Sequence, residues 1–202
     1  MLHQCKVNGV EIRWNTEVDE EMIKELKPDV IIMATGAKPL VPNIPGLKET
    51  GVVLANNVLQ GDPVLKQSVL IVGGGEVGVE TAEFATDYCT RVTIIDMLPA
   101  VAPTLYLTVR NALIKRLKDE EVEISTETKV KEFIPGGVIA EKDGKEVRLE
   151  GYDTVVLALG SKPYVPFDAN GLAPKVCVIG DAEAVKDAKW AIYKAYRTAM
   201  EI

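Results

Sequence analysis

Residues 67–96 read "QSVLIVGGGEVGVETAEFATDYCTRVTIID", and their pattern is the strongest indication of the fold. An apolar run leads into a glycine-rich loop, a helical pattern follows, and a second apolar run ends at Asp96. Strand, glycine loop, helix and strand in this order form one compact βαβ unit. The stretch therefore predicts an α/β protein built on a parallel sheet.

The glycine loop carries a G-x-G-x-x-G fingerprint in the context that the motif requires, after a strand and at the start of a helix. Gly73 would permit the tight turn, Gly75 would let the backbone approach a pyrophosphate, and Gly78 would let helix and strand pack closely. The pyrophosphate would meet free N–H groups at the positive end of the helix. For Glu76, the favoured interpretation is a favourable charge at that helix N-terminus.

Asp96 is the expected partner of the adenosine ribose. A carboxylate at this strand end accepts hydrogen bonds from the ribose hydroxyls and repels a 2′-phosphate, which favours NADH over NADPH. The alternative is that the glycines form only a loop and that Asp96 is a surface acid.

Composition excludes several classes of partner. Hydrophobic residues make up 47% and charged residues 26%, and the formal net charge is −7, which argues against binding to nucleic acid or to an anionic membrane. No apolar run approaches the roughly 20 residues of a bilayer span. Three cysteines without C-x-x-C spacing argue against a redox dithiol or a metal site in the chain and favour a reducing, cytoplasmic location: Cys5, Cys89 and Cys177.

A repeat indicates how the chain is organised. "DVIIMATGAKP" (29–39) and "DTVVLALGSKP" (153–163) are near-copies, each a strand that ends in glycine before a proline-rich crossing. The repeat predicts two similar Rossmann-like lobes. Residues 48–163 would form a complete NAD-binding lobe, inserted into an outer lobe made of residues 1–47 and 164–202.

Local patterns predict the remaining elements. We expect a strand over 10–14, helices over 19–28 and around 105–117, and an antiparallel meander within 121–150. After "VCVIGD" a helix follows, with a small apolar stripe at Ala188, Ile192, Ala195, Ala199 and Ile202. From the residues alone, Asp181 is either the N-cap of that helix or a cofactor ligand.

With these motifs assembled, the chain resembles the two-dinucleotide-domain flavoprotein reductases. It is most similar to the C-terminal part of the 2,4-dienoyl-CoA reductase / 2-enoate reductase / NADH oxidase family. The resemblance rests on "ATG" (34–36), "GGGEVGVE" (73–80) with Asp96, "LALG" (157–160) and "VIGDA" (178–182).

The resemblance implies a set of cofactor contacts. Thr35 and Gly36 would lie where the chain leaves an FAD-binding lobe, Asp181 would bind the ribityl chain of FAD, and Glu80 would meet the nicotinamide end of NADH. The full predicted set of cofactor-binding residues is Gly73, Gly74, Gly75, Glu76, Val77, Gly78, Glu80, Asp96, Thr35, Gly36, Gly160, Gly180 and Asp181.

The chain also departs from the family pattern. The flavin lobe's own G-x-G-x-x-G is absent, as is everything that would bind FMN, an iron–sulfur cluster or an ene substrate. We therefore expect a fragment with a truncated FAD-binding lobe, inactive alone, whose intact protein carries FAD and an upstream FMN and iron–sulfur region. Residues 1–36 and 176–202 should pair into a sheet with an exposed edge, which predicts a homodimer through that surface.

Two functions remain open. In the first, NADH passes its hydride to a flavin and electrons continue to an upstream enoate-reducing centre, so that no side chain is assigned as catalytic because cofactors carry the chemistry. In the second, the chain is a non-catalytic NAD or adenine-nucleotide module or sensor. A short-chain dehydrogenase is disfavoured because no Y-x-x-x-K follows the fingerprint.

Overall fold

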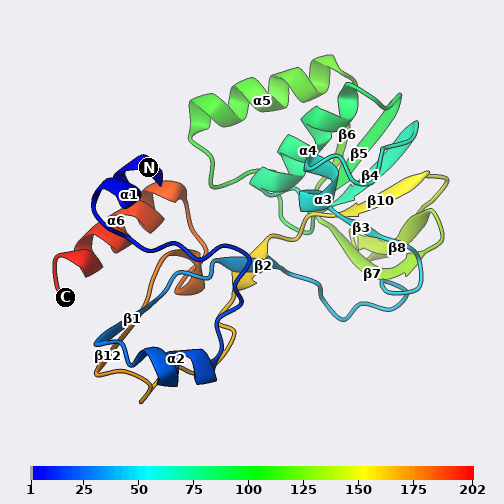
Figure 1. The fold of residues 1–202 in the computed structure, drawn as a ribbon. Coiled ribbons are helices and arrows are strands. Elements are labelled where there is room, and N and C mark those ends of the chain that lie inside the picture. The colour runs from blue at the N-terminus through cyan, green and yellow to red at the C-terminus, as the bar shows by residue number, and fades with distance from the viewer. Residues whose placement is uncertain (1) are drawn as a thin grey trace. The chain divides into compact units, whose positions relative to one another are not determined.

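The computed structural model describes residues 2–202, drawn in Figure 1. The chain divides into two compact units. The outer unit contains the residues up to Ala37 together with Pro163–Ile202, and the inserted unit is Lys38–Lys162. Each unit is described by itself.

The inserted unit is built on a five-stranded sheet in the order β3-β10-β4-β5-β6, and every neighbouring pair in it is parallel. The predicted α/β class with a parallel sheet is thereby confirmed. The strands are β3 (Val53–Leu54), β4 (Ser68–Val72), β5 (Arg91–Ile95), β6 (Glu123–Ser125) and β10 (Thr154–Leu157).

Both faces of this sheet are covered (Figure 1). One face packs against α3 (Ala55–Leu59), α4 (Glu76–Thr86) and α5 (Leu107–Asp119). The other packs against an antiparallel meander of β7 (Thr128–Ile134), β8 (Gly137–Lys142) and β9 (Lys145–Leu149). Burial on both faces explains why β4 is a continuous apolar run and does not alternate.

Alternate residues of β4 enter different cores. Val69 and Ile71 belong to the cluster on the helical face, whereas Leu70 and Val72 belong to the cluster under the meander. All four side chains are at most 3% exposed. This double packing fixes the carboxyl end of β4, where the glycine loop begins.

The outer unit is smaller and less well buried. It contains α1 (Leu2–Val7), α2 (Glu20–Leu26), a single-turn 3-10 helix η1 (Gly180–Ala182) and α6 (Ala188–Ala199). Among its described residues, the sheet has only two strands, the parallel pair β1 (Val30–Met33) and β12 (Lys175–Val178). This pairing of the two ends of the chain confirms the sequence prediction. The two proline-rich crossings, β2 (Ala37–Pro39) and β11 (Ser161–Pro163), also pair with each other.

Local signals placed α2 correctly. The Asp19 side chain accepts a hydrogen bond of 2.9 Å from the N–H of Met22 at the start of the helix. Lys27 ends it in the left-handed conformation, with φ of 46°, before Pro28. An N-cap side chain, a left-handed residue at the C-terminus and a proline after it are common signals for the two ends of a helix.

One local prediction is wrong. Residues 10–14 form no strand: Val10 and Trp14 are 52% and 68% exposed, and Glu11 pairs with Arg13. A strand needs a hydrogen-bonded neighbour, and none is offered to this segment by the described residues. The helix predicted after "VCVIGD" is confirmed as α6, although it contains no buried residue and Ile192 of its apolar stripe is 68% exposed.

The first unit boundary lies earlier than residue 47. Residues 38–47 cluster with the inserted unit because the Pro45 carbonyl accepts a hydrogen bond of 2.8 Å from the N–H of Phe133, and Leu47 is buried beside Phe133. A second difference concerns the region 121–150, where only β7 to β9 form the meander and β6 joins the parallel sheet.

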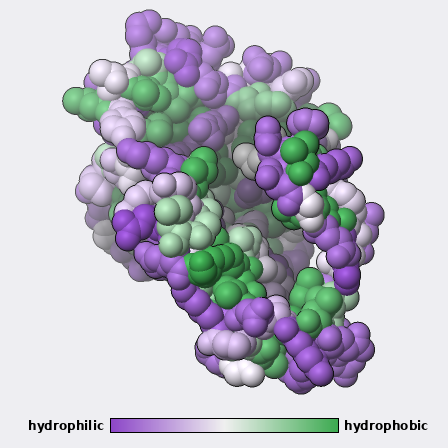
Figure 2. Space-filling view, turned by 60° about the vertical axis from the view of Figure 1, so that its left-hand side comes forward, coloured by the Kyte–Doolittle hydropathy of each residue, from purple (hydrophilic) through white to green (hydrophobic). Residues whose placement is uncertain are grey.

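The molecular surface mixes polar and apolar side chains. Figure 2 shows hydrophobic side chains in separate patches among hydrophilic ones. Within residues 2–202, no helix is both long and apolar enough to cross a bilayer. The same residues contain no group of three or more His, Cys, Asp or Glu side chains placed to hold a metal ion.

Candidate dinucleotide site

The three fingerprint glycines are required for different reasons. At Gly73, φ is +109° and a Cβ would lie 2.4 Å from the Ala158 carbonyl oxygen. At Gly78, a Cβ would lie 2.0 Å from the Gly73 carbonyl oxygen. A side chain at either position would therefore collide with backbone.

Gly75 is different, because a Cβ there would have no heavy atom within 4 Å. It is the N-cap of α4, with φ of −67°, and no side chain caps that helix end. Neither strain nor internal crowding requires a glycine at this position. Open space beside a helix start is what the close approach of a ligand needs.

Both backbone polar groups of Gly74 are hydrogen-bonded. Its N–H donates to Oδ2 of Asp96 at 2.5 Å, and its carbonyl accepts from the N–H of Ala102 at 2.6 Å. A Cβ on Gly74 would lie 2.6 Å from Cγ1 of Val101. Val101 and Ala102, which no sequence motif marks, thus pack directly on the glycine loop.

Asp96 follows β5 and is held by four hydrogen bonds. Besides the bond from Gly74, Oδ1 accepts from the N–H of Leu98 at 2.6 Å. Its backbone N–H donates to Ser125 at 3.1 Å, and its carbonyl accepts from the N–H of Thr128 at 2.8 Å. The half-buried carboxylate is therefore fixed at the carboxyl edge of the sheet, next to the glycine loop.

The first turn of α4 contains the other predicted loop residues. Val77 is half-buried against the core on the helical face. Glu76 is exposed, and its Oε1 accepts a hydrogen bond of 2.7 Å from the Thr104 hydroxyl. Glu80, one turn further on, is exposed as well.

A cavity of about 210 Å³ opens beside Asp96, at the carboxyl ends of β4 and β5. Sequence reasoning missed most of its wall because the lining comes from the first crossing, the strand ends and β7. Asp96 and Lys129 are the charged residues of this wall, which is otherwise mostly apolar. The lining is Pro42, Ile44, Val72, Gly73, Ile95, Asp96, Met97, Thr128, Lys129, Val130 and Leu159.

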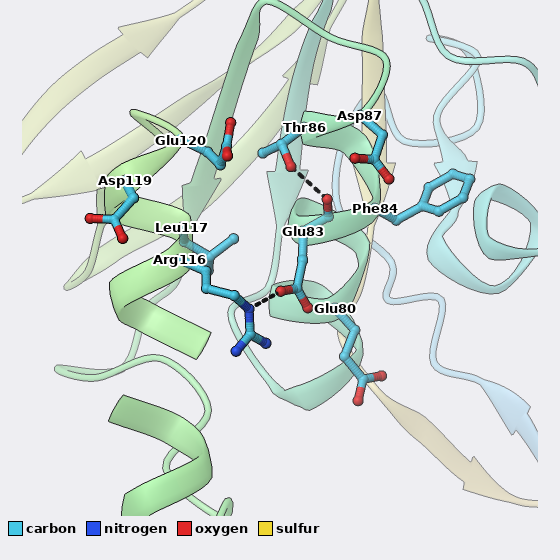
Figure 3. Close-up of a pocket in the computed structure, with 9 residues that line it drawn as sticks. All are labelled: Glu80, Glu83, Phe84, Thr86, Asp87, Arg116, Leu117, Asp119 and Glu120. Atoms are coloured by element: carbon cyan, nitrogen blue, oxygen red, sulfur yellow. Dashed lines mark hydrogen bonds and ion pairs between the residues drawn. The ribbon is translucent and has the colours of Figure 1, made fainter. Parts of the chain in front are cut away.

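A second, larger pocket of about 550 Å³ lies between α4 and α5 (Figure 3). Five carboxylates line it, and its one cation, Arg116, is paired with Glu83. Figure 3 shows the Glu80 carboxylate pointing away from this ion pair. Such a wall repels a pyrophosphate, so charge excludes this pocket as the dinucleotide site despite its size. The lining is Glu80, Glu83, Phe84, Thr86, Asp87, Arg116, Leu117, Asp119 and Glu120.

In the outer unit, Thr35 and Gly36 hold the second crossing. The Thr35 hydroxyl donates to the carbonyl of Tyr164, and the Gly36 carbonyl accepts from the N–H of Tyr164 at 3.0 Å. Gly36 has φ of +75°, as does its counterpart in the inserted unit, Gly160, at +81°. The Gly160 carbonyl accepts from the N–H of Leu40 at 2.9 Å.

Gly180 and Asp181 form the short helix η1, and Gly180 has φ of +61°. Asp181 accepts a hydrogen bond of 3.2 Å from the N–H of Lys186. The N-cap of α6 is Asp187, which accepts from the N–H of Trp190 at 2.7 Å. The interpretation of Asp181 as the cap of that helix is therefore wrong, because a loop separates the two.

A parallel sheet with a glycine turn after one strand and a fixed carboxylate after the next defines a dinucleotide-binding α/β protein. Residues 1–174 match the family described as pyridine nucleotide-disulphide oxidoreductase, and the chain belongs to that family.

Curated relatives identify the group within the family. The chain is 33% identical over 98% of its length to the bilirubin reductase of Mediterraneibacter gnavus and 34% identical over 96% to the NADH oxidase of Thermoanaerobacter brockii. It is 30% identical over 96% of its length to the cinnamate reductase of Clostridium sporogenes. These matches confirm the predicted similarity to flavoproteins of the enoate reductase and NADH oxidase type.

The structural comparison agrees. A solved 2-naphthoyl-CoA reductase covers the whole chain with a TM-score of 0.86 at 26% identity. The chain spans only 31% of that protein, and 31% of both the bilirubin reductase and the NADH oxidase. The matched region is thus about a third of each of these longer proteins.

Proposed function

We propose that this chain binds NADH as the pyridine-nucleotide module of a flavin-dependent oxidoreductase. The observation that carries the proposal is the pairing of an open helix start at Gly75 with the fixed carboxylate of Asp96. Neither φ nor crowding explains the glycine at position 75, but a ligand that occupies the open space beside it does. Membership in the family supports the same conclusion.

The parts of NADH match the parts of the site by chemistry. The pyrophosphate suits the free N–H groups at the start of α4, which begins at Glu76. Each carboxylate oxygen of Asp96 already accepts one backbone hydrogen bond and keeps acceptor capacity for a ribose hydroxyl. The mostly apolar cavity beside Asp96, which includes Ile44, Val130 and Leu159, suits the flat adenine ring.

The preference for NADH over NADPH rests on the same carboxylate. A 2′-phosphate would approach a charge that cannot rotate away, because two backbone N–H groups hold it. Lys129 acts in the opposite sense, since it is the one cation in the cavity wall. It is exposed, so solvent weakens its attraction for a phosphate.

NADH supplies a hydride, and we propose a flavin as its acceptor. This chain's own residues bind and orient the donor, and no side chain is proposed as an acid or base. The outer-unit residues Thr35, Gly36, Gly180 and Asp181 are proposed as one part of an FAD site. The sequence contains a single G-x-G-x-x-G, at 73–78, so these 202 residues do not fit a whole FAD.

We further propose that FAD, together with an upstream FMN and iron–sulfur region that reduces an enoate-like substrate, completes the intact cytoplasmic protein. The names of the reductase relatives and the 31% coverage support this context. The chain alone is then inactive as a reductase. Glu80 remains proposed for the nicotinamide end, since its exposed carboxylate is free to meet a ligand.

A homodimer through the outer unit also remains a proposal. A parallel sheet of two strands, β1 and β12, leaves strand edges that can pair with another chain. Light scattering over a wide concentration range measures this directly. A strictly monomeric mass throughout would exclude it.

A non-catalytic nucleotide-binding module is the second candidate. The glycine loop, Asp96 and the cavity all lie in the inserted unit, so binding does not need the outer unit. The deciding experiments are a fluorescence titration of this chain with NADH and NADPH, and an assay of NADH oxidation by the longer protein that completes the FAD site. Tight NADH binding by the chain together with turnover by the longer protein supports the oxidoreductase. Binding without turnover in the longer protein supports the module, and no binding contradicts both.

A further inference from the structure

The carboxylate of Glu76 lies beside the proposed pyrophosphate site. Glu76 is the first residue of α4 and directly follows Gly75, so its negative charge stands beside the helix start. A carboxylate stabilises a bare helix N-terminus. The same charge opposes the arrival of a pyrophosphate there, which makes the position of the side chain important.

One hydrogen bond determines that position. The Thr104 hydroxyl donates to Oε1 of Glu76 at 2.7 Å. Both side chains are exposed, and Glu76 has no other partner among the hydrogen bonds and ion pairs of the described residues. Without the Thr104 hydroxyl, the Glu76 side chain would be free to change rotamer.

Thr104 follows two buried residues whose backbone is hydrogen-bonded. Two residues before it, Ala102 is fully buried and bonds through its N–H to the Gly74 carbonyl at 2.6 Å. Val101 is 4% exposed, and its carbonyl accepts from Nε of Arg110 at 2.7 Å. The hydroxyl therefore projects from a segment that is fixed to the glycine loop.

The glycines show on which side this segment lies. A Cβ on Gly74 would meet Val101 of the segment, whereas a Cβ on Gly75 would meet nothing within 4 Å. The segment thus lies on the Gly74 side of the loop, and the open space lies on the Gly75 side. A carboxylate tied to Thr104 is drawn toward the segment and away from the open space.

We infer that Thr104 is a positioning residue that holds the Glu76 carboxylate away from the pyrophosphate and so sets the affinity for NADH. This inference rests on the proposed binding of NADH to the glycine loop. Loss of the hydroxyl frees a negative charge to turn over the helix start. There it competes with the phosphates for N–H groups and repels them.

A double-mutant cycle tests the inference. Thr104→Val removes the hydroxyl and keeps the shape, Thr104→Ser retains the hydroxyl, and Glu76→Gln removes the charge. We expect Thr104→Val to weaken NADH binding about threefold, the size of one modest hydrogen bond. Thr104→Ser should bind like the wild type. In the Glu76→Gln background, Thr104→Val should have no effect.

Salt dependence provides a readout that a merely structural role would not change. The penalty of Thr104→Val should be largest in dilute buffer and should shrink as added NaCl screens the freed charge. Equal weakening in both Glu76 backgrounds, or a penalty independent of salt, overturns the inference, as does unchanged affinity. Wild-type protein that does not bind NADH overturns the proposed function as well, so the two failures are distinguishable.

Discussion

The N–H of Gly74 donates to Oδ2 of Asp96 at 2.5 Å and joins positions 22 residues apart. The bond connects the glycine loop to the end of β5. Asp96 thus stabilises the loop in addition to its proposed contact with the ribose. The two roles separate in experiments that measure stability and binding together.

Replacement of Asp96 by alanine should impair both properties. Two backbone donors, those of Gly74 and Leu98, lose a charged acceptor, and hydrogen bonds to charged groups contribute about 1.5–3 kcal/mol each. We expect a lower melting temperature and a loss of NADH affinity of about tenfold or more. Thermal unfolding and fluorescence titration measure the two effects.

Asp87→Asn is the matched control, because Asp87 is an exposed carboxylate at the far end of α4. It should change neither quantity. If Asp96→Ala bound NADH as tightly as the wild type, the ribose role of Asp96 would be wrong.

The fingerprint glycines should respond differently to alanine. Gly78→Ala places a methyl group 2.0 Å from the Gly73 carbonyl oxygen. The free energy of unfolding should therefore fall by several kcal/mol, or the variant should fail to fold. Gly75→Ala meets open space and should fold normally but lose NADH binding. Circular dichroism and titration of both variants provide the comparison. A Gly75→Ala protein with full affinity would show that the open space is not used.

The apolar cavity should bind the adenine ring. Val130→Asp introduces a charge into its wall and should weaken NADH binding about tenfold or more, since an unpaired carboxylate disfavours an apolar ring. Competition by 5′-AMP should weaken in parallel. Val109→Asp, at an exposed position of α5, is the control and should bind normally. A parallel loss in the control, or no loss in Val130→Asp, would argue against this assignment.

Low pH should reduce the stability of the fold through a carboxylate at the amino edge of the sheet, opposite the glycine loop. The Ser68 hydroxyl and N–H both donate to Oδ2 of Asp153, at 2.7 and 3.0 Å. The hydroxyl bond is the main cause that lowers the pKa of Asp153 from its ordinary value of 3.8, and the Ser68 N–H and Lys66 act in the same direction. A carboxyl whose pKa is lower in the folded state adds stability above the unfolded-state pKa, and that stability is lost as the pH falls through the folded-state pKa.

Urea unfolding of Ser68→Ala and the wild type at several pH values tests this sign. The variant should be less stable at pH 7, and the part of the difference due to ionised Asp153 should shrink below about pH 4. Asp143→Asn, in an exposed turn, is the control. A difference that grows as the pH falls would contradict the assignment.

Much of the site could be predicted from the sequence because its requirements are local. The order of strand, glycines, helix and acid within 67–96 was sufficient to predict the βαβ unit and the position of Asp96. Gly78 is required by a steric limit within the same loop, because a Cβ there would meet the Gly73 carbonyl oxygen. Gly73 has a local reason in its φ of +109° and a tertiary one in the nearby Ala158 carbonyl. Asp19, Lys27 and Pro28 likewise determine the ends of α2 by local hydrogen bonding and φ.

The strand predicted over 10–14 failed because the outcome depended on distant neighbours. The pattern of 10–14 is suitable for a strand, but no described strand lies beside it. The helix α6 formed as predicted, and its apolar stripe is suitable for a core, but no residue of that helix is buried. In both cases the pattern showed a capacity for burial, and only the fold could show whether a surface is present to bury it.

Local sequence patterns were sufficient to predict the chain's class, its glycine loop and the acid at the strand end, because backbone geometry is set by residues that are neighbours in the chain. The cavity of Ile44, Val130 and Leu159, and the hydrogen bond from Thr104 to Glu76, depend on tertiary packing. These groups come from separate crossings, strands and loops. Packing of the sheet brings them together, and no local pattern specifies that arrangement.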